Sequence, residues 1–226
     1  MMENKIEKSC LNCDFEEDCK KRKAENEDKK EAPVVMVCDD WKPDVDTRKL
    51  MDEEYDKRIR QFDLLVGKYV PDEFKTWLII NGFFQKPASI KHHGAYTGAL
   101  FDHSFAVTNI LVDLTEQMGL CWQQERSPYI VGMFHDLCKI DTYQRTNDEK
   151  WEYNNATLLP GHGEKSVILL QQHMKLTDEE MLCIRWHMGA FDDKENWNSY
   201  GRSVTKYQNV LWTHHADMYA ARVLQV

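Results

Sequence analysis

The sequence predicts an all-α fold: a helical bundle with a small β-hairpin insertion and a short cysteine-rich segment at its N-terminus. Three observations lead to this prediction. Apolar residues recur at helical spacing in nearly every segment after residue 50, residues 141–163 break that pattern, and residues 1–48 are too charged to hold a core. We therefore divide the chain into an N-terminal segment, 1–48, and a helical domain, 49–226.

Length, charge and hydropathy limit the classes of function. A chain of 226 residues suits one medium domain with a small appendage, and the sequence contains no internal repeat. The net charge of -9 argues against a surface built mainly for nucleic-acid backbones, although a local basic groove is still compatible with it. No run approaches the roughly 18 apolar residues of a membrane helix, and the first residues lack the apolar core of a secretory signal. We expect a cytoplasmic protein without a membrane partner.

The N-terminal segment carries four of the seven cysteines, in the order C-x2-C-x5-C followed by a fourth after a longer gap. In a reducing compartment, such cysteines act as metal ligands or free thiols. A zinc ion would supply the core that this segment lacks. An iron–sulfur cluster or a reduced, disordered tail would share the same pattern. The candidate zinc ligands are Cys10, Cys13, Cys19 and Cys38.

The helices of the domain follow in order from the apolar spacing. Residues 59–69 form the first, and residues 71–82 form a second that begins after a proline and ends on Asn81-Gly82. Residues 100–119 place His103 on the same stripe as Leu100 and Val107, so His103 is predicted to face inward, and Gly119 closes the helix. A fourth helix opens with Ser127 as cap and runs through residue 139, with His135 and Asp136 near its end.

Residues 141–163 predict a hairpin, because two aromatic-containing runs flank a polar Thr-Asn-Asp-Glu turn. We interpret it as a flap on the substrate side. Helicity resumes after residue 163, and Thr177 and Glu180 form a capping box for a helix that carries His187 and stops at Gly189. A polar loop over residues 191–201 precedes the last helix, which bears Asp217.

Four histidines and two aspartates on or beside five successive helical segments indicate a metal site. One histidine on an apolar face is more often a satisfied core residue than a ligand. Burying the whole set is costly unless its members are paired or bound to a cation. Imidazole nitrogen with carboxylate oxygen is the donor set that manganese, iron, cobalt or zinc prefers. The candidate ligands are His103, His135, Asp136, His162, His187 and Asp217.

The order His, His-Asp, Asp resembles the signature of the HD-domain metal-dependent phosphohydrolase superfamily over residues 85–220. The segment KHHGAYTGALFDHS is similar to the one before the first ligand in bacterial HD-domain 3'-5' exoribonucleases, and GMFHDLCKI resembles the family's His-Asp-x-x-Lys motif. The resemblance implies an all-helical bundle whose ligands come from separate helices. It also implies His103, His135, Asp136 and Asp217 as core ligands, with Asp136 able to bridge to a second ion.

His162 in LLPGHGEKS and His187 in IRWHMG resemble the additional histidines of the two-metal branch. The resemblance therefore implies two divalent ions, of Mn, Fe, Co, Ni or Zn, with Mg also compatible. Some two-metal members have adjacent histidines at the later position, where this chain has Met188, so the second ion lacks one ligand. With a single ion, His162 and His187 would instead bind phosphate or act as acid–base groups.

The function implied by the resemblance is hydrolysis of a phosphoester or nucleotide. A bound metal lowers the pKa of its water, and Asp136 belongs to that centre. Lys139, one turn after the His-Asp pair, is expected to contact phosphate as the family lysine does, and Lys165 near a helix N-terminus is a second candidate contact. The alternative for both lysines is solvated surface. Arg145 in the flap is a further candidate.

Two other classes of function stay open. Proteins similar to myo-inositol oxygenase use the same ligand order to hold two irons, and a non-catalytic nucleotide sensor would also keep the ligands. The exonuclease-like passage and Lys139 favour hydrolysis. The expected partners are a small phosphoester or nucleotide, or a short single-stranded nucleic acid, with the oligomeric state undetermined.

The remaining histidines and cysteines of the domain have structural interpretations. The His92–His93 and His214–His215 doublets are expected to pack or to face solvent, although the second doublet could orient Asp217. Cys138 and Cys183 are interpreted as small buried residues.

Overall fold

The computed structural model describes residues 45–90, 94–146, 150–159 and 161–226. The chain divides into two compact units, Met1–Lys57 and Arg58–Val226. Outside the described residues lie the His92–His93 doublet and the four candidate zinc ligands, Cys10, Cys13, Cys19 and Cys38.

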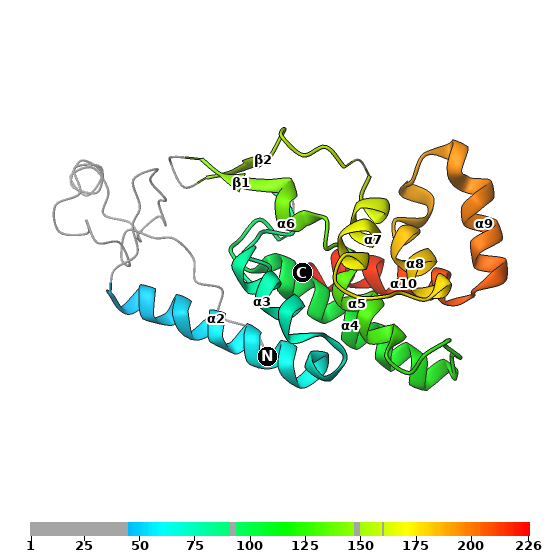
Figure 1. The fold of residues 1–226 in the computed structure, drawn as a ribbon, viewed down its shortest axis with the longest axis horizontal. Coiled ribbons are helices and arrows are strands. Elements are labelled where there is room, and N and C mark those ends of the chain that lie inside the picture. Colours follow the sequence, from blue (N-terminus) through cyan, green and yellow to red (C-terminus); the bar gives the residue numbers. More distant parts are fainter. Residues whose placement is uncertain (1–44, 91–93, 147–149, 160) are drawn as a thin grey trace, which may run out of the picture. The chain divides into compact units, whose positions relative to one another are not determined.

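Helices dominate the described chain, which confirms the predicted all-α class (Figure 1). They are α2 (Val45–Leu65), α3 (Asp72–Ile80), α4 (Ala99–Met118), α5 (Ser127–Phe134), α6 (Lys139–Thr142), α7 (Gly163–Gln171), α8 (Asp178–Arg185), α9 (Trp197–Lys206) and α10 (Asn209–Tyr219). Short 3₁₀ turns form η2 (Gly67–Tyr69), η3 (Gly189–Phe191) and η4 (Lys194–Asn196), and a π-helical turn, η5 (Ala220–Leu224), follows α10.

The predicted hairpin is confirmed between α6 and α7. Strands β1 (Tyr143–Arg145) and β2 (Trp151–Tyr153) are antiparallel, with Tyr143 opposite Tyr153. The Lys86 ammonium donates a hydrogen bond to the carbonyl of Tyr143 over 2.8 Å, which fixes the base of the hairpin to the segment after α3.

Phenylalanine rings fill the core on the side of α4 that faces the N-terminal half of the unit. The rings of Phe62 and Phe84 meet edge to face with centroids 5.4 Å apart, as do those of Phe83 and Phe84. The fully buried rings of this cluster are Phe62, Phe74, Phe83, Phe84, Phe101 and Phe134.

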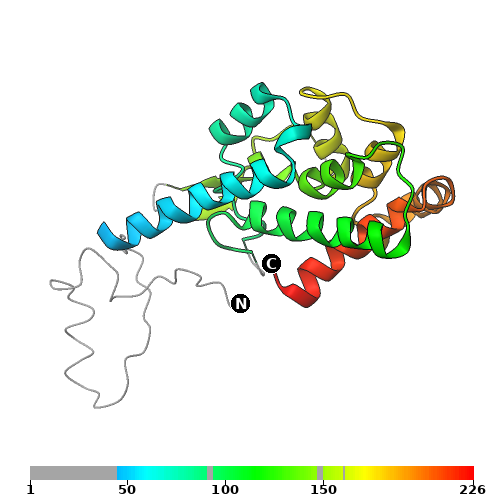
Figure 2. The same ribbon diagram turned by 90° about the horizontal axis from the view of Figure 1, so that it is seen from below.

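Helices α4 and α5 lie unusually close because a glycine faces the contact. A Cβ added at Gly132 would lie 2.6 Å from the Cα of Thr108, which is closer than a real side chain can approach. The close approach brings His103 on α4 beside His135, which directly follows α5. On the other flank of α4 lie α10 and the C-terminal turn (Figure 2).

Two buried glutamates join α8 to its neighbours. The predicted capping box is confirmed, since Glu180 and Thr177 exchange side-chain and backbone hydrogen bonds. Ser127 was predicted to cap α5, and this is wrong: Ser127 is the first helical residue, and its hydroxyl donates to Glu180 over 3.1 Å. Glu179 accepts from the side chain of Asn209, the first residue of α10.

Four helix boundaries differ from the prediction. Helix α2 spans Val45–Leu65, whereas residues 59–69 were predicted. Helix α5 ends at Phe134 instead of continuing through residue 139, because Leu137 and Lys139 make tighter i→i−3 bonds, as expected of 3₁₀ geometry. Helix α8 ends at Arg185, four residues before Gly189. Residues 197–201 belong to α9 and not to a loop, because Asp192 accepts hydrogen bonds from Asn196 and Trp197 and closes the turn before it.

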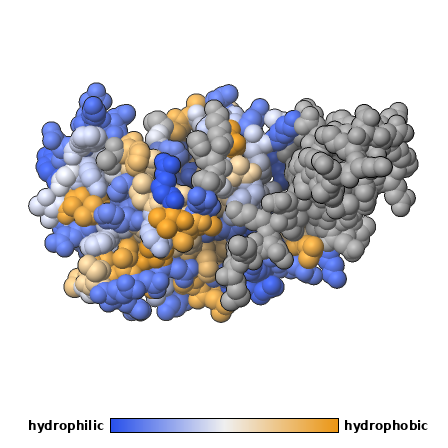
Figure 3. Space-filling model, turned by 180° about the vertical axis from the view of Figure 1, so that it is seen from behind, coloured by the Kyte–Doolittle hydropathy of each residue, from blue (hydrophilic) through white to orange (hydrophobic). Residues whose placement is uncertain are grey.

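None of the helices in the described ranges is both long enough and apolar enough to cross a membrane. On the face shown in Figure 3, hydrophobic patches lie between hydrophilic side chains.

Candidate metal centre

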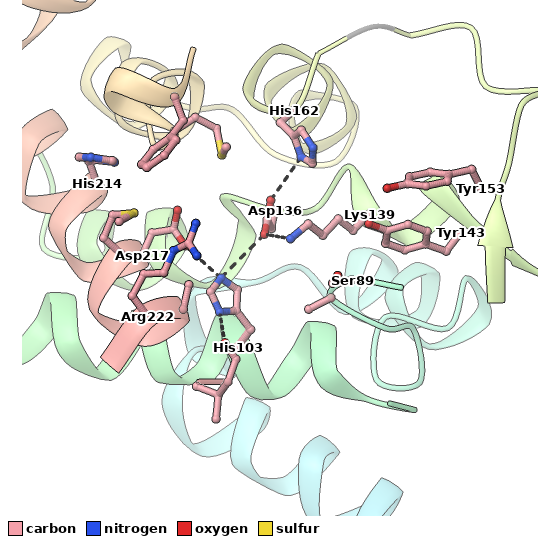
Figure 4. Close-up of a pocket in the computed structure, with 16 residues that line it drawn as sticks. Ser89, His103, Asp136, Lys139, Tyr143, Tyr153, His162, His214, Asp217 and Arg222 are labelled. Carbon is pink, nitrogen blue, oxygen red and sulfur yellow. Dashed lines mark hydrogen bonds and ion pairs between the residues drawn. The ribbon is translucent and has the colours of Figure 1, made fainter. Parts of the chain in front are cut away.

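The predicted ligands lie on two helices, α4 and α10, and in turns beside three others, α5, α7 and α8. His103 lies in the first turns of α4, His135 and Asp136 follow the end of α5, and Asp217 lies on α10. His162 immediately precedes α7, and His187 lies in the turn after α8. The shortened helices α5 and α8 thus leave His135, Asp136 and His187 on turns. Figure 4 shows His103, Asp136, His162 and Asp217 around one pocket.

One group of donors consists of His103, His135 and Asp217. The Nε2 of His103 lies 3.1 Å from Oδ1 of Asp217 and 3.2 Å from Nε2 of His135. The other carboxylate, Asp136, places its Oδ2 3.8 Å from His103 and 3.6 Å from His135. His103 and His135 are 4% and 0% exposed, so their lone pairs are shielded from bulk water.

The second nitrogen of each buried ring is fixed by a backbone carbonyl, which can only accept. The Nδ1 hydrogens of His103, His135 and His187 are therefore donated to the carbonyls of Val226, Gly132 and Ile184, over 2.9, 2.8 and 2.7 Å. In a neutral ring the only N–H hydrogen is then on Nδ1, so Nε2 presents a lone pair. The facing Nε2 atoms of His103 and His135 repel each other unless a cation lies between them.

A second group of donors surrounds Oδ1 of Asp136. The Nε2 of His187 lies 3.5 Å from this oxygen and the Nδ1 of His162 lies 3.7 Å from it. Asp136 therefore directs Oδ2 toward the first group of donors and Oδ1 toward the second. Its Oδ2 also accepts from the ammonium of Lys139, 2.5 Å away.

The protonation states of His135, Asp136 and Asp217 suit metal ligands. Burial lowers the pKa of His135 to about 4, even though Asp136 and Asp217 oppose this shift. Burial would raise the pKa of Asp136, but the Lys139 ammonium and His135 hold it well below its usual range. Burial would also raise the pKa of Asp217, yet the His103 side chain beside it lowers it to about 2. Neutral imidazole and ionised carboxylate are the forms that bind divalent metals. The hydrogen bond to Asp136 raises the pKa of His162 to about 10, so an ion bound there would have to displace a proton from His162.

His187 supplies a direct indication that a cation belongs here. Its Nε2 is fully buried and has no hydrogen-bond partner within the described part of the chain. Buried polar atoms in native proteins are nearly always satisfied. A cation next to Asp136 would satisfy this nitrogen, so the residues fit a metal ion.

Members of both donor groups, His103 and Asp217 of the first and Asp136 and His162 of the second, line a pocket of about 330 Å³. His135 and His187 are buried and are not among its lining residues. Tyr143 and Tyr153 of the hairpin line one side, and Met188, Phe191 and His214 line another. The sequence did not predict that Tyr143, Tyr153 and Arg222 line the pocket. The aromatic residues of the predicted hairpin were the only feature of the sequence that pointed to the two tyrosines. His214 donates to the carbonyl of His187 over 2.7 Å, so it supports His187 instead of Asp217.

The two predicted phosphate-binding lysines have different surroundings. Lys139 lines the pocket beside Asp136. Lys165 is 3% exposed, is paired with Asp141, and is not among the residues that line this pocket. Arg145 lies over the ring of Trp151, with the guanidinium carbon 4.9 Å from the ring centroid, and is likewise not a lining residue.

The family model of the HD domain matches residues 100–217, which include all six predicted ligands. The chain belongs to the HD domain family, and so to the superfamily of HD-domain metal-dependent phosphohydrolases. No curated protein and no solved structure matches the chain.

Proposed function

We propose that this protein is a metal-dependent phosphohydrolase that cleaves small phosphoesters, nucleotides among them. The observation that carries the proposal is a single pocket that is lined by members of both histidine–aspartate donor groups and by Lys139, whose ammonium contacts Asp136. Metal donors alone would serve an oxygenase equally well. The Lys139 ammonium in the same pocket supports an anionic substrate.

The roles of the residues follow from their positions. His103, His135 and Asp217 would hold one divalent ion, with Asp136 Oδ2 facing the same two histidines. Asp136 Oδ1, His162 and His187 would hold a second ion. When bound, such ions lower the pKa of a coordinated water and neutralise phosphate charge. Lys139 would contact a phosphoryl oxygen when the substrate displaces part of its contact with Asp136.

The size and lining of the pocket favour a small substrate. A volume of about 330 Å³ lies at the lower end of the range for ligand sites. Such a pocket suits a mononucleotide or the terminal nucleotide of a short single strand, and it is too small for a duplex. Arg222 also lines the pocket and adds a second positive charge to that of Lys139.

The test is turnover of a phosphoester panel that includes mononucleotides, cyclic nucleotides and short oligonucleotides. Metal-free protein is reloaded with manganese, iron, cobalt, zinc or magnesium. Metal bound by the N-terminal cysteines would add to the measured metal content. The test therefore also uses a variant, called the four-serine chain, in which Cys10, Cys13, Cys19 and Cys38 are replaced by serine.

Asp136→Asn keeps the shape of the side chain but removes its negative charge, so metal content and turnover should both be lost. Asp113→Asn on the exposed face of α4 is the matched control and should keep both. Turnover by Asp136→Asn protein without bound metal would contradict the proposal. So would oxygen consumption by iron-loaded protein that hydrolyses nothing in the panel.

A further inference from the structure

A thiol lies next to the donors of the second ion. The Sγ of Cys138 is 3.4 Å from Nδ1 of His162, the same nitrogen that faces Oδ1 of Asp136. One atom from each of Asp136, Cys138 and His162 lies within 4.8 Å of the other two. Cys138 is reduced and 1% exposed, and it follows Asp136 by two residues in the turn between α5 and α6.

The distances among these donors suit one small ion. Bonds of about 2.0–2.3 Å to a tetrahedral zinc ion place its nitrogen, oxygen and sulfur ligands about 3.3–3.6 Å apart. The sulfur–nitrogen distance of 3.4 Å falls in this range. The distances from Asp136 Oδ1 to the two histidines, 3.5 Å for His187 and 3.7 Å for His162, lie within or just beyond it.

An independent observation points to a ligand at the same oxygen of Asp136. The Nε2 of His187 is buried, has no hydrogen-bond partner among the described residues, and is directed toward Oδ1 of Asp136. A metal ion beside Oδ1 of Asp136 would satisfy this nitrogen. The residue after His187 is Met188, so the chain does not offer an adjacent histidine as a further ligand.

We propose that Cys138 is a thiolate ligand of the second ion, together with Asp136, His162 and His187. This inference rests on the two-ion form of the proposed function. On binding, the thiol releases its proton to solvent and its sulfur takes the ligand position left open by Met188. Thiolate sulfur is a soft donor, so this position selects zinc or cobalt over magnesium and manganese.

The same sulfur–nitrogen distance also suits an ordinary S–H···N hydrogen bond from Cys138 to His162. The two arrangements differ in a property that can be measured without turnover. A cobalt ion bound to thiolate shows an intense near-ultraviolet charge-transfer band, whereas a cobalt ion bound only to nitrogen and oxygen does not.

The test is a cobalt titration of the metal-free four-serine chain, followed by absorption spectroscopy. The charge-transfer band should appear as the second cobalt ion binds. It should be lost in Cys138→Ala, and the affinity for the second ion should fall by more than the roughly 10- to 100-fold that loss of an outer-shell partner costs. Cys183→Ala removes the other fully buried thiol of the described chain and should leave the band unchanged.

Cys138→Ser serves as a second variant. If it still binds the first ion and keeps the unfolding temperature of the parent, it is folded. A band that persists in either Cys138 variant would overturn the proposal. A parent chain that binds two cobalt ions without the band, or that binds fewer than two, would overturn it as well. Turnover on the same samples separates the two proposals: turnover without the band rejects only the Cys138 ligand, and the band without turnover rejects only the hydrolase.

Discussion

Lys139 is held against the metal donors by its own short segment of chain. It is three residues after Asp136, and its ammonium lies 2.5 Å from the carboxylate. Burial would lower the pKa of Lys139, but the charge of Asp136 raises it, so the side chain stays protonated near neutral pH. A protonated lysine at this position can bind phosphate without any change in its charge.

Lys139→Met should therefore reduce kcat/KM by about 10²- to 10³-fold, the usual effect of losing one group that stabilises transition-state charge. The metal content should stay near that of the parent, because lysine is not a ligand. Lys175→Met, on the exposed turn before α8, is the control. Full activity of the Lys139 variant would exclude a role in binding phosphate, and loss of metal would show that its role is structural.

At the residue scale, sequence reasoning could find donors but not their partners. The apolar stripe on residues 100–118 placed His103 inside, and its exposure of 4% confirms this. The pairing of Lys165 with Asp141 and the bond from His103 to the carbonyl of Val226 join residues far apart in the chain. Such contacts depend on how the helices pack, and no local pattern encodes them.

Among the elements, the N-terminal end of α7 packs directly against the backbone at the end of α8, and this close contact requires a glycine at position 163. A Cβ on Gly163 would collide with the carbonyl oxygen of Arg185 at the end of α8. This contact places His162, the residue before Gly163, near His187, two residues after Arg185. The geometry of the second ion therefore depends on Gly163.

Gly163→Ala should push α7 away from α8, destabilise the fold by about 1–3 kcal/mol and weaken the second metal site more than the first. Metal content by mass spectrometry and unfolding in urea provide the two measurements. Gly201→Ala in α9 meets no atom within 4 Å and should not destabilise the protein. Equal loss of both ions in the Gly163 variant would contradict this account.

The hairpin is the element that meets the substrate in this account. Tyr143 and Tyr153 pair across its strands with ring centroids 5.4 Å apart, and Tyr153 is 49% exposed at the pocket. An exposed ring beside a phosphate-binding floor offers a stacking surface for a nucleobase.

Tyr153→Ala should raise KM for nucleotides by about 5-fold or more, since stacking contributes about 1–3 kcal/mol per base. KM for glycerol phosphate, which has no ring, should stay unchanged. Gln144→Ala on the same hairpin, whose side chain pairs with Glu152, is the control. An equal change for both substrates would show that the hairpin acts by shape alone.

Sequence patterns predicted the elements better than their ends. The hairpin, the capping box of α8 and the inward face of α4 follow from local periodicity and turn chemistry. Helices α5 and α8 stop before the predicted residue, and His135, Asp136 and His187 lie in the turns that follow them. The resemblance to HD-domain proteins predicted the ligand residues, but not these turns.

For the whole molecule, the metal centre is expected to contribute to stability as well as to chemistry. The donors come from α4, α10 and the turns around α5, α7 and α8, so ions would cross-link most of the helical unit. A ligand present at 100 times its Kd stabilises a fold by about 2.7 kcal/mol.

A chelator should therefore lower the unfolding temperature of the four-serine chain by about 5–10 °C. The same chelator should have no effect on Asp136→Asn protein, which lacks the carboxylate shared by both donor groups. Differential scanning calorimetry measures both shifts. A chelator effect of equal size in the two proteins would place the stabilising metal elsewhere in the chain.

The most direct test of the metal centre is an anomalous difference map from crystals of the protein grown with zinc. We predict a peak between His103, His135 and Asp217 and a second beside Asp136, His162 and His187. Zinc bound in solution by the four-serine chain, with no peak at either position in its crystals, would contradict the account.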